Sequence, residues 1–328
     1  MCLYPKFIMN RKYIPNKKNK GIPPTIKDGR TLYVPVGCGK CMECRRQKAR
    51  EWRVRLQEDV RTDARTAYFV TLSFSDKSLI ELERDLNCNL TGYNLDNKIA
   101  TLAVRRFLER WRKTFKASVK HWLVTELGQE STERIHIHGI IWSSPLDCYD
   151  LQLDFVALLR SHWKYGNVWA GTYVNERTVN YIVKYINKAD AKHKYYIPII
   201  LCSKGIGKNY LSRPDSVNNK YDEKNTNELY TTRQGIKLPL PIYYRNKIYT
   251  EEQKELLWLQ LLDTNTRYVN RIKVDVSENE DDYWRVLKDA RIKNAQLGYG
   301  SDEIDVERHK YEQDLRNLKR LQRIAKNK

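Results

Sequence analysis

The segment ERIHIHGIIW (133–142) constrains the fold more strongly than any other part of the chain. Side chains of a β-strand alternate between two faces, so its isoleucines would share one face, with His136 and His138 on the other. The segments YFVTLSF (68–74) and HWLVTE (121–126) are rich in β-branched and aromatic residues, which is typical of strands. The pattern predicts a central antiparallel sheet with the two histidines on its open face.

Two imidazoles that lie two residues apart on one face of a strand can bind the same metal ion. Glu126 ends the preceding strand and can approach that ion across the hairpin. Two nitrogens and a carboxylate with open coordination positions suit Mg²⁺ or Mn²⁺ as a Lewis acid, and Zn²⁺ is compatible as well. The alternative is a plain sheet surface from which His136 and His138 face solvent.

The segment VNYIVKYINK (179–188) predicts a helix with two contrasting ridges. At about 100° per residue, four apolar side chains fall on one side of this helix, and two phenols and two ammonium groups fall on the other. The apolar ridge consists of Val179, Ile182, Val183 and Ile186, and the opposite ridge of Tyr181, Lys184, Tyr185 and Lys188. Tyrosine in a helix usually packs in a core, but here the apolar ridge already provides a face to bury.

This polar ridge has the chemistry for cleaving a phosphodiester. A phenolate can attack phosphorus and form a covalent phosphotyrosine. Lys184 and Lys188 can stabilise the negative charge that develops on the phosphate oxygens. Tyr181 and Tyr185 lie one helical turn apart, so both can reach one phosphate.

The composition indicates a polyanionic partner. The 328 residues include 60 Lys and Arg against 40 Asp and Glu, a net charge of +20, which favours nucleic acid as the partner. No stretch approaches 20 apolar residues and no signal-peptide core is present, so we expect a soluble intracellular protein without a membrane partner. The odd number of cysteines, seven, is typical of a reducing compartment.

Cys38, Cys41 and Cys44 follow C-x-x-C-x-x-C spacing, and Cys2 is a candidate fourth ligand. Four thiolates would form a structural Zn²⁺ site; three free thiols at the start of a helix are the alternative. A basic run follows the cysteines. We predict that it lies along the DNA backbone, with a solvated helix face as the alternative. The run comprises Arg45, Arg46, Lys48, Arg50, Arg53 and Arg55.

The rest of the chain predicts an α+β fold, with helices flanking the sheet. Residues 1–36 are polar and Pro-rich, and we expect irregular structure there. Further helices are expected at 101–116 and 150–163, and the region after about residue 215 is expected to be mainly helical and basic.

Taken together, these motifs resemble the HUH superfamily of rolling-circle replication initiators. FVTLSF (69–74) corresponds to the first motif of that superfamily, and HIH (136–138) to the second. The third, Tyr181-x-x-Lys184-Tyr185-x-x-Lys188, matches the two-tyrosine branch. The chain is most similar to initiators of gokushovirus-type Microviridae, which are small single-stranded DNA phages. That likeness rests on ERIHIHGIIW, VPVGCGKCMECRRQKAREWRVRL (34–56), NYIVKYINK (180–188) and SKGIGKNYL (203–211).

The resemblance implies site-specific nicking of one strand at the replication origin. The protein would become linked to the 5′-phosphate, and the free 3′-hydroxyl would prime synthesis by the host DNA polymerase. After each round the displaced strand would be cut and rejoined into a circle. The resemblance assigns the metal to His136, His138 and Glu126, the nucleophilic attacks to Tyr181 and Tyr185, and assistance at the phosphate to Lys188 and Lys184.

The chain has no G-x-x-x-x-G-K-[ST] phosphate loop, so a host helicase is an expected partner, in the host bacterial cytoplasm. The expected organisation is an N-terminal Cys-rich basic segment (1–60), a nicking domain (61–215) and a helical, basic C-terminal region (216–328). A plasmid relaxase or single-strand transposase of the same superfamily is the alternative enzyme. A non-enzymatic, zinc-containing nucleic-acid-binding protein is the alternative outside enzymes.

Overall fold

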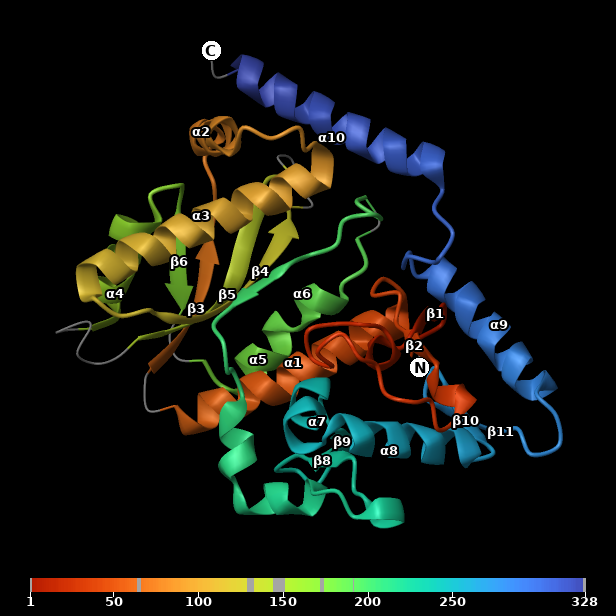
Figure 1. The fold of residues 1–328 in the computed structure, drawn as a ribbon. Helices are drawn as coiled ribbons and strands as arrows, with labels where there is room; N and C mark the ends of the chain where they lie inside the picture. The colour runs from red at the N-terminus through yellow and green to blue at the C-terminus, as the bar shows by residue number, and fades with distance from the viewer. Residues whose placement is uncertain are drawn as a thin grey trace. The chain divides into compact units, whose positions relative to one another are not determined.

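The computed structural model describes residues 2–63, 66–128, 133–143, 151–171, 174–190 and 192–326, with the backbone alone for residues 151–154. The fold is mixed α/β, as expected, and the chain forms two compact units (Figure 1). The first unit comprises Met1–Val54 and Tyr210–Glu303, and the second comprises Arg55–Asn209 and Ile304–Lys328. Each unit is therefore assembled from two segments that are distant in sequence.

A five-stranded antiparallel sheet forms the centre of the second unit, in the order β6-β3-β5-β4-β7. The histidine strand β5 is the middle strand, with β3 and β4 on either side. The strands are β3 (Thr66–Leu72), β4 (Lys120–Leu127), β5 (Ile135–Ser143), β6 (Val168–Gly171) and β7 (Ile200–Cys202). The expected antiparallel sheet is confirmed, and the short edge strands β6 and β7 were not predicted.

One face of this sheet is apolar and covered by helices. The three isoleucines of β5 are fully buried there, together with Phe107 and Trp111 of α3 (Gly92–Phe115). Figure 1 shows α3 running across the sheet, with α4 (Leu151–Trp163) beside it. Helix α3 begins earlier than the expected residue 101. Residue 150, where α4 was expected to begin, lies outside the described residues.

Two further helices pack on α3 within the second unit: α2 (Asp76–Leu86) and α10 (Val306–Lys326). The contact with α10 contains a buried ion pair, because Arg316 donates to both carboxylate oxygens of Asp96 at 2.8 and 3.1 Å. Arg316 is only 4 % exposed. The last helix of the described chain is therefore an integral part of the unit that contains the sheet.

The expected helix over 179–188 is divided at Val183 into α5 (Glu176–Ile182) and α6 (Lys184–Asn187). Its four apolar residues are nevertheless all buried, as the helical pattern predicted. Lys188 lies just beyond α6 in extended backbone rather than on the helix. Side chains from the end of α1 (Met42–Thr62) support α5, and Arg61 donates to Glu176 at 2.6 Å.

The first unit contains more strands than the sequence indicated. Residues 1–36 were expected to be irregular, but β1 (Lys6–Met9) pairs with β2 (Tyr33–Val36). The region after residue 215 contains two hairpins in addition to its helices. These elements are β8 (Leu229–Thr231), β9 (Lys237–Pro239), α7 (Ile242–Ile248), α8 (Glu251–Asp263), β10 (Thr266–Val269), β11 (Ile272–Asp275) and α9 (Asp281–Gln296). Among the described helices of the whole chain, none is both long enough and apolar enough to cross a membrane.

Candidate active site

The open face of the sheet brings together the three metal ligands that the sequence suggested. Glu126 on β4 lies directly opposite His136 on β5, and His138 lies opposite Val124 two positions further along. Since side chains two residues apart share a face, Glu126, His136 and His138 project from the same side of the sheet. The strand register therefore converts the predicted alternation into one cluster.

The distances in this cluster suit a metal ion. Glu126 Oε2 lies 3.1 Å from His136 Nε2 and 3.0 Å from His138 Nε2. The ligand atoms of all three residues lie within 4.8 Å of one another. Ligands about 2.1 Å from one ion, at right angles to each other, lie about 3.0 Å apart. The spacing of the carboxylate and the two imidazoles therefore fits a divalent ion.

Hydrogen bonds on the far side of each imidazole fix the ring nitrogens. His136 Nδ1 lies 3.2 Å from the carbonyl oxygen of Arg134, and His138 Nδ1 lies 3.0 Å from Thr71 Oγ1. A carbonyl oxygen only accepts, so His136 Nδ1 is the donor, and in the neutral ring Nε2 carries a lone pair. That lone pair faces a carboxylate oxygen, an arrangement that requires a cation, either a proton or a metal ion, between the two atoms.

The charges around the cluster favour ionised Glu126 and neutral His138. Burial would raise the pKa of Glu126, but hydrogen bonds from His136, His138 and Lys188 outweigh burial and hold that pKa below its ordinary range. Burial lowers the pKa of His138, which keeps the imidazole in the form that binds metals. Lys188 Nζ donates to Glu126 Oε1 at 2.8 Å, so the lysine lies within reach of anything bound at the cluster.

The two tyrosines lie against the histidine strand. The Tyr185 ring stacks on His138 with centroids 4.3 Å apart and planes 7° apart. Tyr185 donates a hydrogen bond to the Tyr181 hydroxyl at 2.9 Å. Burial, and then the bond to Tyr181, raise the pKa of Tyr185. Tyr181 is 51 % exposed, and Lys184 Nζ lies 6.0 Å from the centre of its ring.

A cleft of about 680 Å³ opens beside the cluster, and Glu126, His136 and Lys188 lie on its wall. Arg134 also lines the cleft, where its guanidinium donates to Asp76 at 2.6 Å. The remaining lining residues are Thr71, Ser73, Phe74, Ser75, Leu127, Gly128, Ile135, Gly166 and Asn167. Polar groups and backbone of this kind can contact a nucleic-acid strand that leads to the metal cluster.

Three neighbours of the cluster were not predicted from the sequence: Thr71, Arg134 and Trp169. Trp169 on β6 is exposed and lies edge-on to Phe69, with ring centroids 5.5 Å apart. Phe69 in turn stacks on His138 at 6.0 Å. An exposed indole in this position offers a surface on which a base can stack. Thr71 follows from the pairing of β3 with β5, which places it opposite His138.

The basic run after the cysteines is divided among several environments. Arg45 is buried, with its guanidinium 5.9 Å from the centre of the Tyr299 ring. Arg46 donates to Asn270 at 2.9 Å. Arg55, in the second unit, donates to the carbonyl oxygen of Ile206 at 3.0 Å. Lys48 is exposed, and Arg50 and Arg53 are half-buried. Contact of this run with DNA stays a prediction, and Arg45 is its least accessible member.

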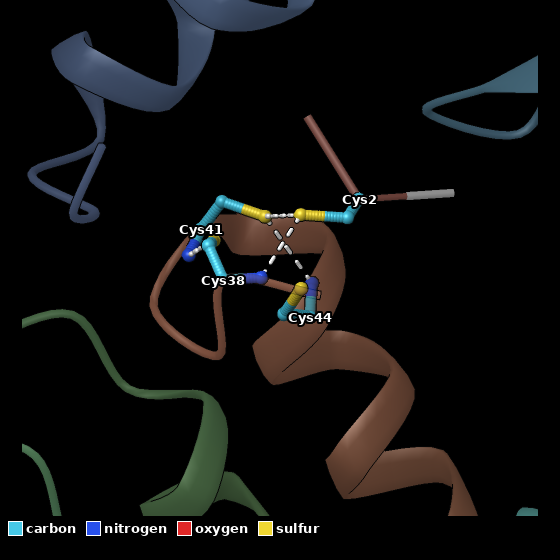
Figure 2. A group of neighbouring side chains, drawn as sticks. All are labelled: Cys2, Cys38, Cys41 and Cys44. Carbon is cyan, nitrogen blue, oxygen red and sulfur yellow. Dashed lines mark hydrogen bonds between the residues drawn. The ribbon is translucent and has the colours of Figure 1, made fainter. Parts of the chain in front are cut away.

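The four cysteines singled out in the sequence come together in the first unit. Sγ atoms of Cys2, Cys38, Cys41 and Cys44 all lie within 4.8 Å of one another (Figure 2). Cys88 and Cys202 are exposed and do not belong to this cluster. The seventh cysteine, Cys148, lies outside the described residues.

Comparison with known proteins supports a role in replication. Residues 67–190 match a family model of replication-associated proteins of the ORF2 type. That match spans β3 to α6 and contains the metal cluster and both tyrosines. Over 240 residues, the chain is 26 % identical to the Replication-associated protein ORF2 of Spiroplasma virus 4, a match that covers 67 % of this chain and 69 % of the viral protein. No solved structure matches the chain.

Both matches are to replication-associated proteins, and they support the class that the sequence motifs suggested, a phage replication initiator. The matched region coincides with the part of the second unit that carries Glu126, the two histidines and the two tyrosines. The chemistry of this site is therefore the natural basis for a specific function.

Proposed function

We propose that this chain is a rolling-circle replication initiator of the HUH type, which nicks and rejoins single-stranded DNA through a tyrosine nucleophile. One observation carries the proposal: Tyr185 stacks on His138 while it donates to Tyr181, so two phenols adjoin a ready-made set of metal ligands. A phosphate bound at Glu126, His136 and His138 would lie next to both hydroxyl groups.

The chain's own residues assign the parts of the site. Glu126, His136 and His138 would hold one divalent cation, Mg²⁺ or Mn²⁺, which supplies Lewis-acid stabilisation of the phosphate when bound. Lys188 neutralises Glu126 in the free protein and lies where it can turn to a phosphate oxygen. Lys184, beside Tyr181, adds a second positive charge on the same side.

Cleavage transfers a phosphodiester from DNA to the protein. A tyrosine oxygen attacks the scissile phosphorus and loses its proton to solvent. The bond from phosphorus to the 3′-oxygen breaks, and that oxygen takes a proton and leaves as a 3′-hydroxyl. The protein then holds the downstream strand as a 5′-phosphotyrosine ester. The ester conserves the energy of the broken bond, so a second 3′-hydroxyl can reverse the step and join two ends.

The pair of tyrosines explains how one protein would cut and join in turn. While one phenol is esterified, the other, 2.9 Å away in the free protein, remains available for a second cleavage after one round of synthesis. The 3′-hydroxyl from that second cleavage can attack the first ester and close a circle. Origin DNA, a host helicase and the host DNA polymerase are the partners that this cycle requires, in the host bacterial cytoplasm.

The proposal is tested by looking for the covalent intermediate. The full chain is incubated with Mn²⁺ and a pool of single-stranded oligonucleotides of random sequence, and protein that carries DNA after denaturation is isolated and sequenced. We expect an adduct with an enriched cleavage sequence. The double variant Tyr181→Phe, Tyr185→Phe should form none, whereas Tyr311→Phe, which alters an exposed tyrosine on α10, should behave as the unaltered chain.

The same assay separates the competing functions. A non-enzymatic DNA-binding protein would retain DNA only before denaturation. If the double variant forms as much adduct as the unaltered chain, the nucleophiles are wrong. If excess chelator leaves adduct formation unchanged, Glu126, His136 and His138 do not act through a metal ion.

A further inference from the structure

The first unit contains a second cluster of metal-ligand side chains, which lies outside the proposed nicking site. We infer that Cys2, Cys38, Cys41 and Cys44 bind one Zn²⁺ ion as four thiolates, and that this ion joins the two segments of the first unit. The inference rests on the geometry of the cluster and does not depend on the proposed function.

The sulfur positions suit a single tetrahedral ion. Cys2 Sγ and Cys41 Sγ lie 3.9 Å apart, and all four sulfurs lie within 4.8 Å of one another. Sulfurs about 2.3 Å from a zinc ion, at the corners of a tetrahedron, lie about 3.8 Å apart. A disulfide requires about 2.05 Å between sulfurs, and the cysteines of this cluster are all free thiols. An iron–sulfur cluster would need to spread its cysteine ligands more widely than a single ion does.

Backbone N–H groups are directed at the sulfurs, which is a second and independent observation. Cys2 Sγ accepts from Tyr4 N at 3.3 Å and from Cys38 N at 3.2 Å. Cys38 Sγ accepts from Cys41 N at 3.3 Å, and Cys41 Sγ accepts from Cys44 N at 3.5 Å. A neutral thiol is a weak acceptor, whereas a thiolate bound to a metal keeps negative charge on sulfur. Four such contacts favour a thiolate site.

The turn that presents these sulfurs depends on two glycines. Gly39 has φ +76°, a left-handed conformation that glycine adopts without strain, and it turns the chain between Cys38 and Cys41. A Cβ at Gly37 would lie 3.1 Å from Cys44 Sγ, so the backbone there passes directly against the sulfur. Figure 2 shows the four side chains pointing toward one another from the N-terminal segment, this turn and the start of α1.

Contacts around the cluster show what the ion would hold in place. Arg291 on α9 donates to the carbonyl oxygen of Leu3 at 3.0 Å, and Met42 N donates to Asn294 Oδ1 at 2.8 Å. Leu3, Met42 and Leu287 are buried in one apolar cluster with Cys41. The ion would therefore fix the N-terminal segment and the start of α1 in the positions that α9 binds, across more than 230 residues of sequence.

The test begins with metal analysis of the full chain after chelator treatment. A chelator should strip an exchangeable Mg²⁺ or Mn²⁺ from the nicking site but leave one zinc ion per chain in the thiolate site. X-ray absorption at the zinc edge should show four sulfur neighbours at about 2.3 Å. Less than about a tenth of an ion per chain, iron in place of zinc, or nitrogen or oxygen among the neighbours would overturn the inference.

Matched cysteine variants locate the ion. Cys38→Ser should lower retained zinc at least tenfold, whereas Cys88→Ser, the same change at an exposed cysteine elsewhere, should leave it at one per chain. If Cys38→Ser does not fold, the unaltered chain is treated with a mercurial reagent, which should release one equivalent of zinc. Amide exchange should then accelerate in residues 2–9 and 281–296 and stay slow in β3 and β5. Retention of zinc by Cys38→Ser, or uniform loss of protection, would contradict the inference.

Discussion

The hydrogen bond between the two tyrosines predicts that they are not equivalent in the first cleavage. Tyr185 is the donor and Tyr181 the acceptor, and the pKa of Tyr185 is raised, so Tyr185 keeps its proton more firmly. When the Tyr181 oxygen becomes a phenolate, the bond from Tyr185 becomes charge-assisted and stronger. Tyr181, which is also the more exposed phenol, is therefore expected to attack first.

The size of the effect follows from this one hydrogen bond. A bond to a charged group contributes about 1.5–3 kcal/mol. At about 1.4 kcal/mol for each factor of ten, its loss in Tyr185→Phe should slow the first cleavage roughly 10- to 150-fold. The phenylalanine ring preserves the stacking on His138, so little else changes. Tyr181→Phe removes the attacking oxygen itself and should abolish the first adduct.

A single-turnover assay measures this difference. The oligonucleotide is labelled at its 3′ end, because the protein stays joined to the 5′-phosphate of the downstream segment, and adduct is followed on denaturing gels. Tyr185→Phe should form adduct slowly and give no circular product, since a second nucleophile is then missing. Rapid adduct formation by Tyr181→Phe together with none by Tyr185→Phe would refute the reasoning.

Three further predictions concern single residues. Glu126→Gln removes the anionic ligand, and the Mn²⁺ concentration for half-maximal adduct formation should rise at least about tenfold; an unchanged requirement contradicts its role as a ligand. Arg316→Met leaves the buried carboxylate of Asp96 unpaired, so urea unfolding should show a loss of about 3–5 kcal/mol, against almost none for the exposed-site control Lys326→Met. Burial opposes the charged form of His193, but hydrogen bonds to Asp190 and Glu133 prevail and raise its pKa above 6.5. The unfolding free energy should therefore be highest below pH 6.5 and fall as pH rises through the raised pKa, and His193→Gln should remove that slope between pH 6 and pH 8.5.

Local periodicity predicted the metal cluster because all of its information lies in one hairpin. Alternation placed His136 and His138 on one face, and the end of the preceding strand offered Glu126. The same applies to the buried ridge of the tyrosine helix, whose four apolar residues follow a period of 3.6. The catalytic roles of all these residues remain proposals.

Features that depend on pairing between distant segments were not predicted. Thr71 contacts His138 only through the register of β3 against β5, and Trp169 reaches the site because β6 pairs with β3. Strands of three or four residues, such as β6 and β7, are too short to show a period. The break at Val183 was missed for a different reason. Several β-branched residues in this stretch weaken its helix propensity without disturbing the apolar pattern.

The position of α10 has a consequence for the order of events in a cell. Most of the first unit's residues, Tyr210–Glu303, are translated between the sheet and the helix that completes its cover. A nascent chain would therefore expose the upper surface of α3, with the Asp96 carboxylate unmatched, until Arg316 leaves the ribosome. Competence to cut DNA would then be a late event in synthesis, so that incomplete chains do not leave nicked genomes behind.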